Sequence, residues 1–286
     1  MADKLPTLLT LLPAVATVYG TMVVGFLLRK AGYFPSSVDV PMTRVVVSVL
    51  FPGFIVANLL GQMPGGSVEN SGGDTLSILL APAIGFGSVV LGFGIGYAAA
   101  PLIGLTDRRA RRAFAFVVGM HNYGFLPLPL ADALAAAGLI HPDTVPAILV
   151  HNIGVEIAFW SVGIMLASGQ IGQFRRDAWK KLLNAPLITI AVVIVLNLTG
   201  VADGLARGMP RLNGWLLDTG GFLGGAAIPL ALLLIGGAVA DVWNEADFRS
   251  GLPTILGASV IRLAAMPVLM LTAAYFLTGF GDQTRH

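Results

Sequence analysis

Long apolar runs separated by short polar segments dominate the sequence. A run of about 20 apolar residues matches the hydrocarbon thickness that a membrane helix must cross. Strands of a membrane barrel would instead be about ten residues long, with alternating polarity. The pattern therefore predicts an all-α polytopic membrane protein with about eight transmembrane helices. The predicted spans are Leu8–Leu28, Val40–Leu60, Leu76–Pro101, Ala113–Ala137, Val145–Ala167, Leu182–Leu198, Trp215–Ala240 and Leu252–Leu277.

The fourth run contains residues that interrupt a helix. It includes His121-Asn122-Tyr123-Gly124-Phe125-Leu126-Pro127-Leu128-Pro129-Leu130. Proline lacks the N–H that a helix needs, and its ring clashes with the preceding turn. In hydrocarbon the freed carbonyls must find partners inside the protein or beside a water-filled cavity. Because broken membrane helices form binding sites in secondary transporters, we expect a discontinuous fourth helix with a site at its break. A proline kink that serves packing alone is the other interpretation.

Composition supports the membrane class. Apolar residues make up 56% of the chain and charged residues 11%, against about 25% charged in a typical soluble domain. The net charge of +2 does not suggest nucleic acid as a partner. The absence of cysteine excludes disulfides and thiolate metal sites. The sequence also has no His-Glu-x-x-His or Gly-x-Ser-x-Gly motif, so we expect neither an enzyme nor a bound cofactor.

Basic residues gather in alternate connections between the predicted spans. These residues are Arg29, Lys30 and Arg44, then Arg108, Arg109, Arg111 and Arg112, then Arg175, Arg176, Lys180 and Lys181. Because Lys and Arg in short loops stay cytoplasmic, the N-terminus and the C-terminus are both predicted outside, in a bacterial-type inner (plasma) membrane. The first run is too long for a signal-peptide core, so we expect an uncleaved span. The acidic segment Asp241–Ser250 fits this topology less well, because it should be cytoplasmic.

Polar residues inside the predicted spans are the candidate site. Intramembrane ionisable groups are costly and are by default functional candidates. The candidates for substrate binding are Asn58, Asn122, Tyr123, Gly124, Pro127, Pro129 and Arg262. The N-terminus of the half-helix after the break would suit a carboxylate, because free N–H groups and the helix dipole both attract anions.

The candidates for ion coupling are His121, Asp132, His151, Asn152 and Glu156. Asn152 and Glu156 are four residues apart and so share one helical face. Glu156 could hold Na⁺ or carry a proton. The alternative is a structural ion pair between Glu156 and Arg262, because an unpaired buried charge is very unfavourable.

Two features suggest how the spans are arranged. Pro52 and Pro229 occupy similar positions in the second and seventh spans, which predicts a five-span unit repeated in inverted orientation. Glycines at Gly92-Gly96 and Gly221-Gly225 have the small-xxx-small spacing of close helix packing.

The motifs together resemble the auxin efflux carrier family, within the bile-acid:sodium symporter-like group. The most specific is the run from Asn122 to Leu130. Supporting motifs are Leu149-Val150-His151-Asn152, Phe159-Trp160, Asn184-Ala185-Pro186-Leu187 and Ile261-Arg262-Leu263. The resemblance implies two inverted five-helix repeats with crossed, broken helices at the site, transport of organic anions that are usually carboxylates, and a homodimer. Residues 1–170 would form the first repeat, with its break near 121–130, and residues 171–286 three helices of the second.

The sequence stops at His286, before the ninth and tenth spans that the resemblance implies. The leading hypothesis is a secondary active transporter of small organic anions, such as auxin-like compounds or dicarboxylates. It would work by alternating access, in membrane lipid, coupled to H⁺ or Na⁺. The alternative is a truncated or non-transporting membrane protein of the same fold that binds or regulates a partner.

Overall fold

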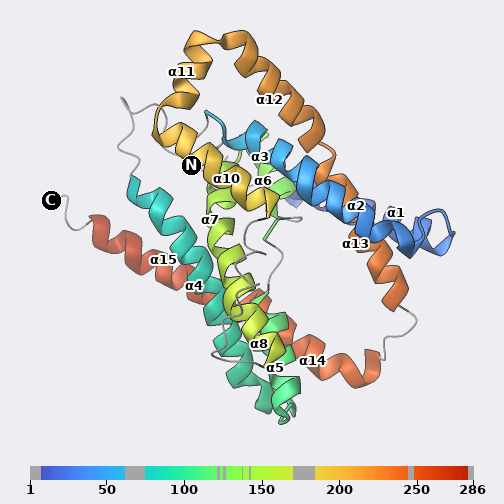
Figure 1. Ribbon diagram of the computed structural model, residues 1–286. Helices are drawn as coiled ribbons and strands as arrows, with labels where there is room; N and C mark the ends of the chain where they lie inside the picture. The colour runs from blue at the N-terminus through green and yellow to red at the C-terminus, as the bar shows by residue number, and fades with distance from the viewer. Residues whose placement is uncertain are drawn as a thin grey trace.

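The regular structure is helical in all the described parts of the chain. The computed structural model describes residues 8–61, 75–120, 123–124, 127–136, 138–141, 143–169, 184–243 and 248–282. The helices (Figure 1) are α1 (Leu8–Lys30), α2 (Asp39–Val45), α3 (Phe51–Leu59), α4 (Thr75–Ala99), α5 (Arg108–Gly119), α6 (Pro127–Ala136), α7 (Thr144–Ala158), α8 (Ile164–Ser168), α10 (Ala185–Leu198), α11 (Val201–Gly208), α12 (Pro210–Gly224), α13 (Ala227–Val242), α14 (Phe248–Val260) and α15 (Met266–Asp282). Three π-helical turns join consecutive helices, at Val46–Leu50, Phe159–Gly163 and Ile261–Ala265.

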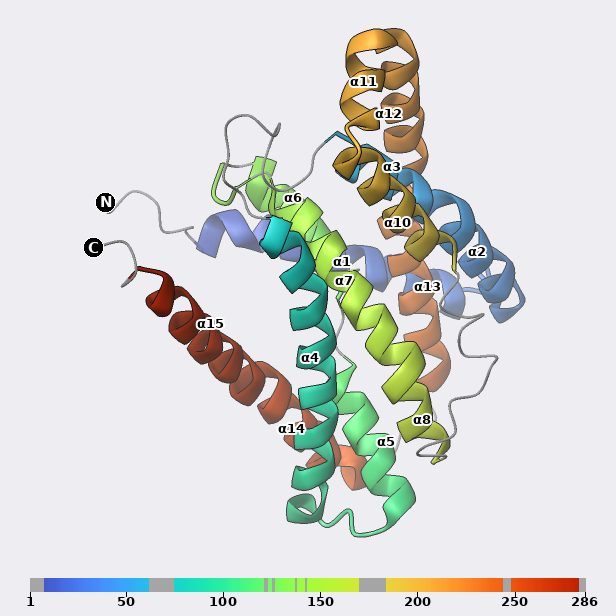
Figure 2. The ribbon, with the colours of Figure 1, turned by 60° about the vertical axis from the view of Figure 1, so that its left-hand side comes forward.

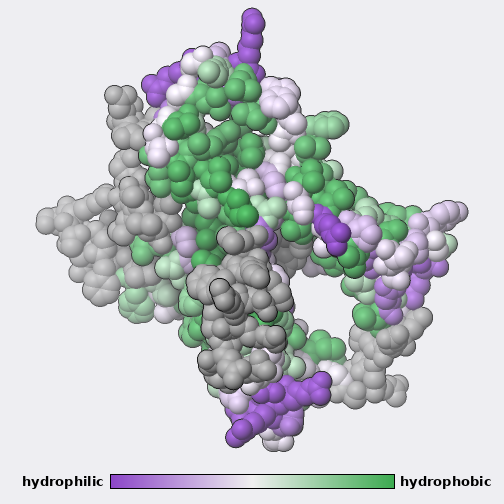
Figure 3. Space-filling view, in the orientation of Figure 1, coloured by the Kyte–Doolittle hydropathy of each residue, from purple (hydrophilic) through white to green (hydrophobic). Residues whose placement is uncertain are grey.

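The helices have the length and polarity of membrane spans. Within the described ranges, five continuous helical stretches are long and apolar enough to cross a membrane, or six if α10 and α11, bent by 74°, form one span, against the eight predicted. In Figure 3 hydrophilic side chains gather at the lower end of the molecule, over the start of α5, and hydrophobic ones cover much of the surface between the ends. The prediction of an all-α polytopic membrane protein is therefore confirmed.

The fourth predicted span is broken. Helix α5 ends at Gly119 and α6 begins at Pro127, and the described residues between them, Met120, Tyr123 and Gly124, are not helical. The discontinuous fourth helix is confirmed. At its other end α5 is capped by Asp107, whose carboxylate accepts hydrogen bonds from backbone N–H groups of the first turn. These bonds, the largest effect coming from Ala110, lower the pKa of the Asp107 carboxyl.

Glycines let α4 approach α7 very closely. A Cβ atom on Gly85 of α4 would collide with the carbonyl oxygen of His151, and one on Gly154 of α7 would collide with the carbonyl oxygen of Pro82. The two helices run side by side in Figure 2. Small residues allow membrane helix backbones to approach each other closely, so this contact depends on glycine at both positions.

One of the two glycine pairs predicted to pack against another helix does so. Gly92-Gly96 faces α5 as expected, since a Cβ atom at either position would lie 2.8 Å from an α5 Cα atom. The prediction for Gly221-Gly225 is wrong. A Cβ on Gly221 would meet nothing within 4 Å, and one on Gly225 would meet only its own helix. The glycines that face α3 are Gly220 and Gly224. They precede the predicted pair by one residue, which turns the contact face by about 100° around the helix.

An ion-pair network ties the end of α1 to α2 and α13. The nearly buried Arg29 donates hydrogen bonds to Asp39 and, over 2.9 Å, to Asp241. Its guanidinium also lies over the ring of Phe34, 5.4 Å from the centroid. The acidic residue at the head of Asp241–Ser250 is thus the partner of a buried arginine. This partly accounts for acidic character where the positive-inside pattern predicts basic residues.

Replacing Gly154 with alanine should separate α4 from α7. We expect Gly154→Ala to lower the free energy of unfolding by about 3 kcal/mol, at the upper end of the cost of overpacking, because the new methyl group meets backbone rather than a movable side chain. The matched control is Gly87→Ala in α4, where a Cβ atom meets nothing within 4 Å. Unfolding in detergent would be measured for both variants. Equal unfolding midpoints would contradict the packing described here.

Candidate functional site at the break in the fourth helix

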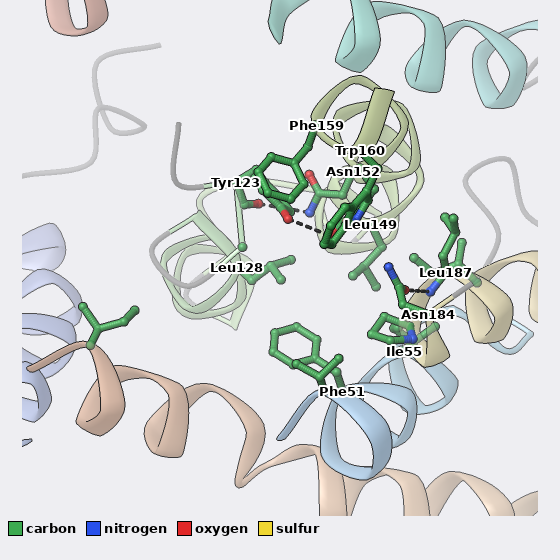
Figure 4. A pocket seen from close by; sticks show the side chains of 16 residues that line it. Phe51, Ile55, Tyr123, Leu128, Leu149, Asn152, Phe159, Trp160, Asn184 and Leu187 are labelled. Atoms are coloured by element: carbon green, nitrogen blue, oxygen red, sulfur yellow. Dashed lines mark hydrogen bonds between the residues drawn. The ribbon is translucent and has the colours of Figure 1, made fainter. Parts of the chain in front are cut away.

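A cavity of about 480 Å³ lies beside the break. Its walls come from α3, α6, α7, α10 and α13, from the two π-helical turns at Val46–Leu50 and Phe159–Gly163, and from the non-helical break itself (Figure 4). The lining is mainly aliphatic and aromatic. The residues are Val47, Phe51, Ile55, Tyr123, Gly124, Leu128, Leu149, Asn152, Glu156, Phe159, Trp160, Asn184, Pro186, Leu187, Ile190 and Ile235. We call this space the main cavity.

Among the described residues that line the main cavity, Glu156 is the charged one. Its carboxylate is held by two donors: the Tyr123 hydroxyl at 2.6 Å and the Trp160 indole Nε1 at 2.9 Å. Trp160 lies one turn further along the same helix and Tyr123 lies in the break. A charge-assisted hydrogen bond is stronger than a neutral one, so these two contacts fix the carboxylate at the cavity wall.

Asn152 holds the backbone of the break. Its buried amide donates from Nδ2 to the carbonyl oxygen of Tyr123 over 3.0 Å. That carbonyl lies outside any helix, and in an apolar interior it would be costly to leave without a donor. Asn152 and Glu156 are one turn apart on α7, as their spacing predicts, and both contact Tyr123 of the break. Tyr123 is therefore attached to α7 twice, through its carbonyl and through its hydroxyl.

Asn184 is a polar residue of the main cavity that was missed as a site candidate. Its Oδ1 accepts from the backbone N–H of Leu187 and caps α10, and Figure 4 shows its Nδ2 turned into the cavity. The signal was present in Asn184-Ala185-Pro186-Leu187, because an asparagine before a proline in the first helical turn is typical of an N-cap. A capping asparagine uses its oxygen and leaves its two N–H donors available.

The start of α6 offers fewer donors than expected. Pro127 and Pro129 have no N–H, and the N–H of Leu128 donates to the carbonyl of Gly124 at 3.0 Å. Of the first three residues of this helix, none has a free backbone donor. Both prolines are half-buried, and they line neither cavity.

A second cavity of about 810 Å³ lies on the other side of α7, between α4, α5 and the helix formed by α14 and α15. Both Arg262 and His151 line it. Arg262 is thus not the partner of Glu156: its Nη1 donates to the Val117 carbonyl over 3.5 Å. The structure divides the predicted site residues between two cavities. The side chain of His151 lies on the side of α7 that faces the second cavity. Its Nδ1 is 3.4 Å from Oδ1 of Asn152.

The other candidates lie apart from both cavities or outside the described residues. Asn58 donates to the Phe54 carbonyl of its own helix, which is a common local arrangement in helices. Asp132 is exposed on α6. His121 and Asn122 lie outside the described residues.

Comparison with known proteins gives one family. Residues 10–176 match the family model described as membrane transport protein. A relative from Methanothermobacter thermautotrophicus, described as an uncharacterized transporter, is 24% identical over 263 residues. The aligned part covers 92% of this chain and 78% of the relative. No solved structure matches the chain.

Substituting Asn152 should loosen the break. We expect Asn152→Leu to raise amide hydrogen exchange around Tyr123 and Gly124 by about tenfold, because an unmet buried carbonyl costs about 1–3 kcal/mol. Hydrogen exchange with mass spectrometry measures this directly. Asn58→Leu is the matched control, since Asn58 donates to a carbonyl of its own helix and to no other group in the described ranges. Unchanged exchange around the break in Asn152→Leu would show that another group holds it.

Proposed function

This chain belongs to the membrane transport protein family, the family of the auxin efflux carriers, and we propose that it is a secondary carrier of small organic acids. The proposed mechanism is alternating access, with cargo bound in the main cavity and coupled to protons through Glu156. The observation that carries the proposal is the position of this carboxylate, at the wall of an apolar cavity beside a broken membrane helix.

The lining of the main cavity supports a small acid with an apolar body. A volume of about 480 Å³ lies within the range of small-molecule sites, which are mostly apolar with a few placed polar groups. Phe51, Phe159 and Trp160 offer aromatic surface to the body of the cargo. The Nδ2 group of Asn184 offers a hydrogen-bond donor to its carboxylate.

Charge balance supports coupling to a cation. A carboxylate in the main cavity would lie near the carboxyl group of Glu156, with no Lys, Arg or His among the described residues that line it. Two like charges in an apolar space repel strongly, so one of them must be neutralised. Cargo binding then brings a proton with it.

The geometry around Glu156 favours H⁺ over Na⁺. Both carboxylate oxygens already accept hydrogen bonds, and the indole N–H of Trp160 can only donate. The indole of Trp160 therefore cannot coordinate sodium. The Tyr123 hydroxyl can donate to an ionised Glu156 or accept from a protonated one, so a proton can be gained with little rearrangement.

The helix packing supports movement about the main cavity. Glycine contacts join α4 closely to α5 and α7, and join α1 to α13 and α3 to α12. The main cavity lies between a first group, α4, α5 and α7, and a second group, α1, α3, α12 and α13. In the proposed mechanism these two groups move relative to each other. We propose further that the carrier lies in the inner membrane with both termini outside. It would work as a homodimer, each chain containing one five-helix repeat and part of a second.

The coupling test is Glu156→Gln in proteoliposomes. With one proton per cargo molecule and the membrane potential clamped, a gradient of about one pH unit should accumulate radiolabelled phthalate, which stays charged and does not cross the bilayer unaided, roughly tenfold, because one unit is worth about 1.4 kcal/mol. We expect the variant to exchange phthalate across the membrane but to accumulate none when the gradient is imposed. Uptake and counterflow measured in the same vesicles separate coupling from binding.

Asp132→Asn is the matched control. It removes the acid of α6, which is exposed and does not line the cavity, and should leave accumulation unchanged. Full proton-driven accumulation by Glu156→Gln would refute the role of this residue. Accumulation driven by a sodium gradient alone would refute the choice of ion.

A further inference from the structure

The second cavity is separate from the main cavity and has the opposite charge. Helix α7 divides the two, so that Asn152 lines one while its neighbour His151 lines the other. The main cavity carries the carboxylate of Glu156, and the second cavity carries the guanidinium of Arg262. In Figure 2 α15 diverges from α4. Residues of both helices and of α14 line the second cavity.

Arg262 is a membrane-embedded cation without a carboxylate partner in the described part of the chain. It lies at the middle of the span Gly251–Ala273, on the π-helical turn Ile261–Ala265. Its Nη1 donates to the carbonyl of Val117 over 3.5 Å. A guanidinium has five N–H donors and keeps its charge in proteins, and charged side chains at this depth pair with another group.

The contact with Val117 does not by itself account for this arginine. A cation near the C-terminus of a helix is favourable, and Val117 lies in the last turn of α5. At 3.5 Å the bond is at the limit for an N–H donor, and it engages one donor of the five. The remaining donors belong to a side chain that lines a cavity of about 810 Å³.

We propose that the second cavity binds a small organic carboxylate through Arg262. The planar guanidinium matches a carboxylate with two parallel hydrogen bonds. Ser259 lines the same space and adds a hydroxyl group, while Ile255, Met266 and Met270 provide apolar surface for the body of the ligand. This site does not depend on cargo binding in the main cavity.

The site lies next to the break in the fourth helix. Val117, Val118 and Gly119, the last residues of α5, line the second cavity, and the break that follows them lines the main cavity. A carboxylate at Arg262 would therefore contact the half-helix that leads into the break. This makes the second cavity a site for a second acid beside the cargo path.

The experiment is equilibrium binding of radiolabelled benzoate and hexanoate to the purified full-length chain in detergent. We expect two sites per chain for at least one of the two acids in the wild type. Arg262→Gln should weaken one of them at least tenfold, because a charge-assisted bidentate contact is lost. Arg262→Lys keeps the charge but loses the fork, and should weaken that site less.

Fluorescence of Trp160 reports on the main cavity separately. Benzoate that quenches this tryptophan, shown by comparison with Trp160→Phe, should do so equally in the wild type and in Arg262→Gln. Absence of this quenching with Arg262-dependent binding intact would count against the proposed cargo site and leave the second site standing.

The matched control is Arg207→Gln. The Arg207 side chain is 82% exposed on α11, and its loss should change neither site. The proposal is overturned if Arg262→Gln and the wild type bind both acids with the same stoichiometry and affinity. It is also overturned if the wild type binds one acid molecule per chain and that molecule quenches Trp160, because the second cavity is then empty.

Discussion

A backbone carbonyl inside a membrane protein must have a hydrogen-bond donor, and the break in the fourth helix produces such a carbonyl at Tyr123. Asn152 supplies the donor over 3.0 Å. Because an unmet carbonyl in an apolar interior is costly, α7 must lie against the break. The glycines of α4 and α7 allow the close packing that holds α7 in place. A binding site follows from this need, since the residues that satisfy the broken backbone also line the cavity beside it.

A charged side chain inside the membrane also needs hydrogen-bond partners. Two such side chains lie on opposite sides of α7. Glu156 meets this need within the chain, through the hydroxyl of Tyr123 and the indole of Trp160. Arg262 meets only part of it, through one long hydrogen bond to a carbonyl. One cavity therefore holds a carboxylate with its donors supplied, and the other holds donors in excess. The proposed carrier would use the first arrangement to bind an acid together with a proton, and the proposed second site would use the second to bind an ionised acid.

The sequence predicted the elements of this fold better than their contacts. Apolar runs located the helices, because the length of a span is fixed by the membrane. Prolines and a glycine located the break, and the spacing of Asn152 and Glu156 placed both on one wall of the main cavity. The cavity that Arg262 faces could not be predicted, because an apolar run does not tell which face of the eighth span meets α5. The π-helical turn at this residue also changes the register of the helix.

Asn184 and the glycines of α12 were missed for a related reason. Asn184 was identified only as part of a family motif, although its capping position leaves an amide group directed into the cavity. In α12 the spacing of four residues was right, but the facing pair began at Gly220 rather than Gly221. Spacing along a helix fixes which residues share a face, and the neighbouring helix decides which of those faces is buried.

The pattern of helix contacts bears on the division into repeats, which stays a prediction. If α10 repeats α1, and α12 with α13 repeats α2 with α3, then the contact between α1 and α13 should have an equivalent between α10 and α3. Both contacts are present, and α3 also packs on α12, as the second and seventh spans would if a two-fold axis related them. The pairing of Pro52 with Pro229 leads to the same correspondence from sequence alone. An inverted repeat accounts for all three contacts with one symmetry operation, whereas unrelated helices would need a separate reason for each.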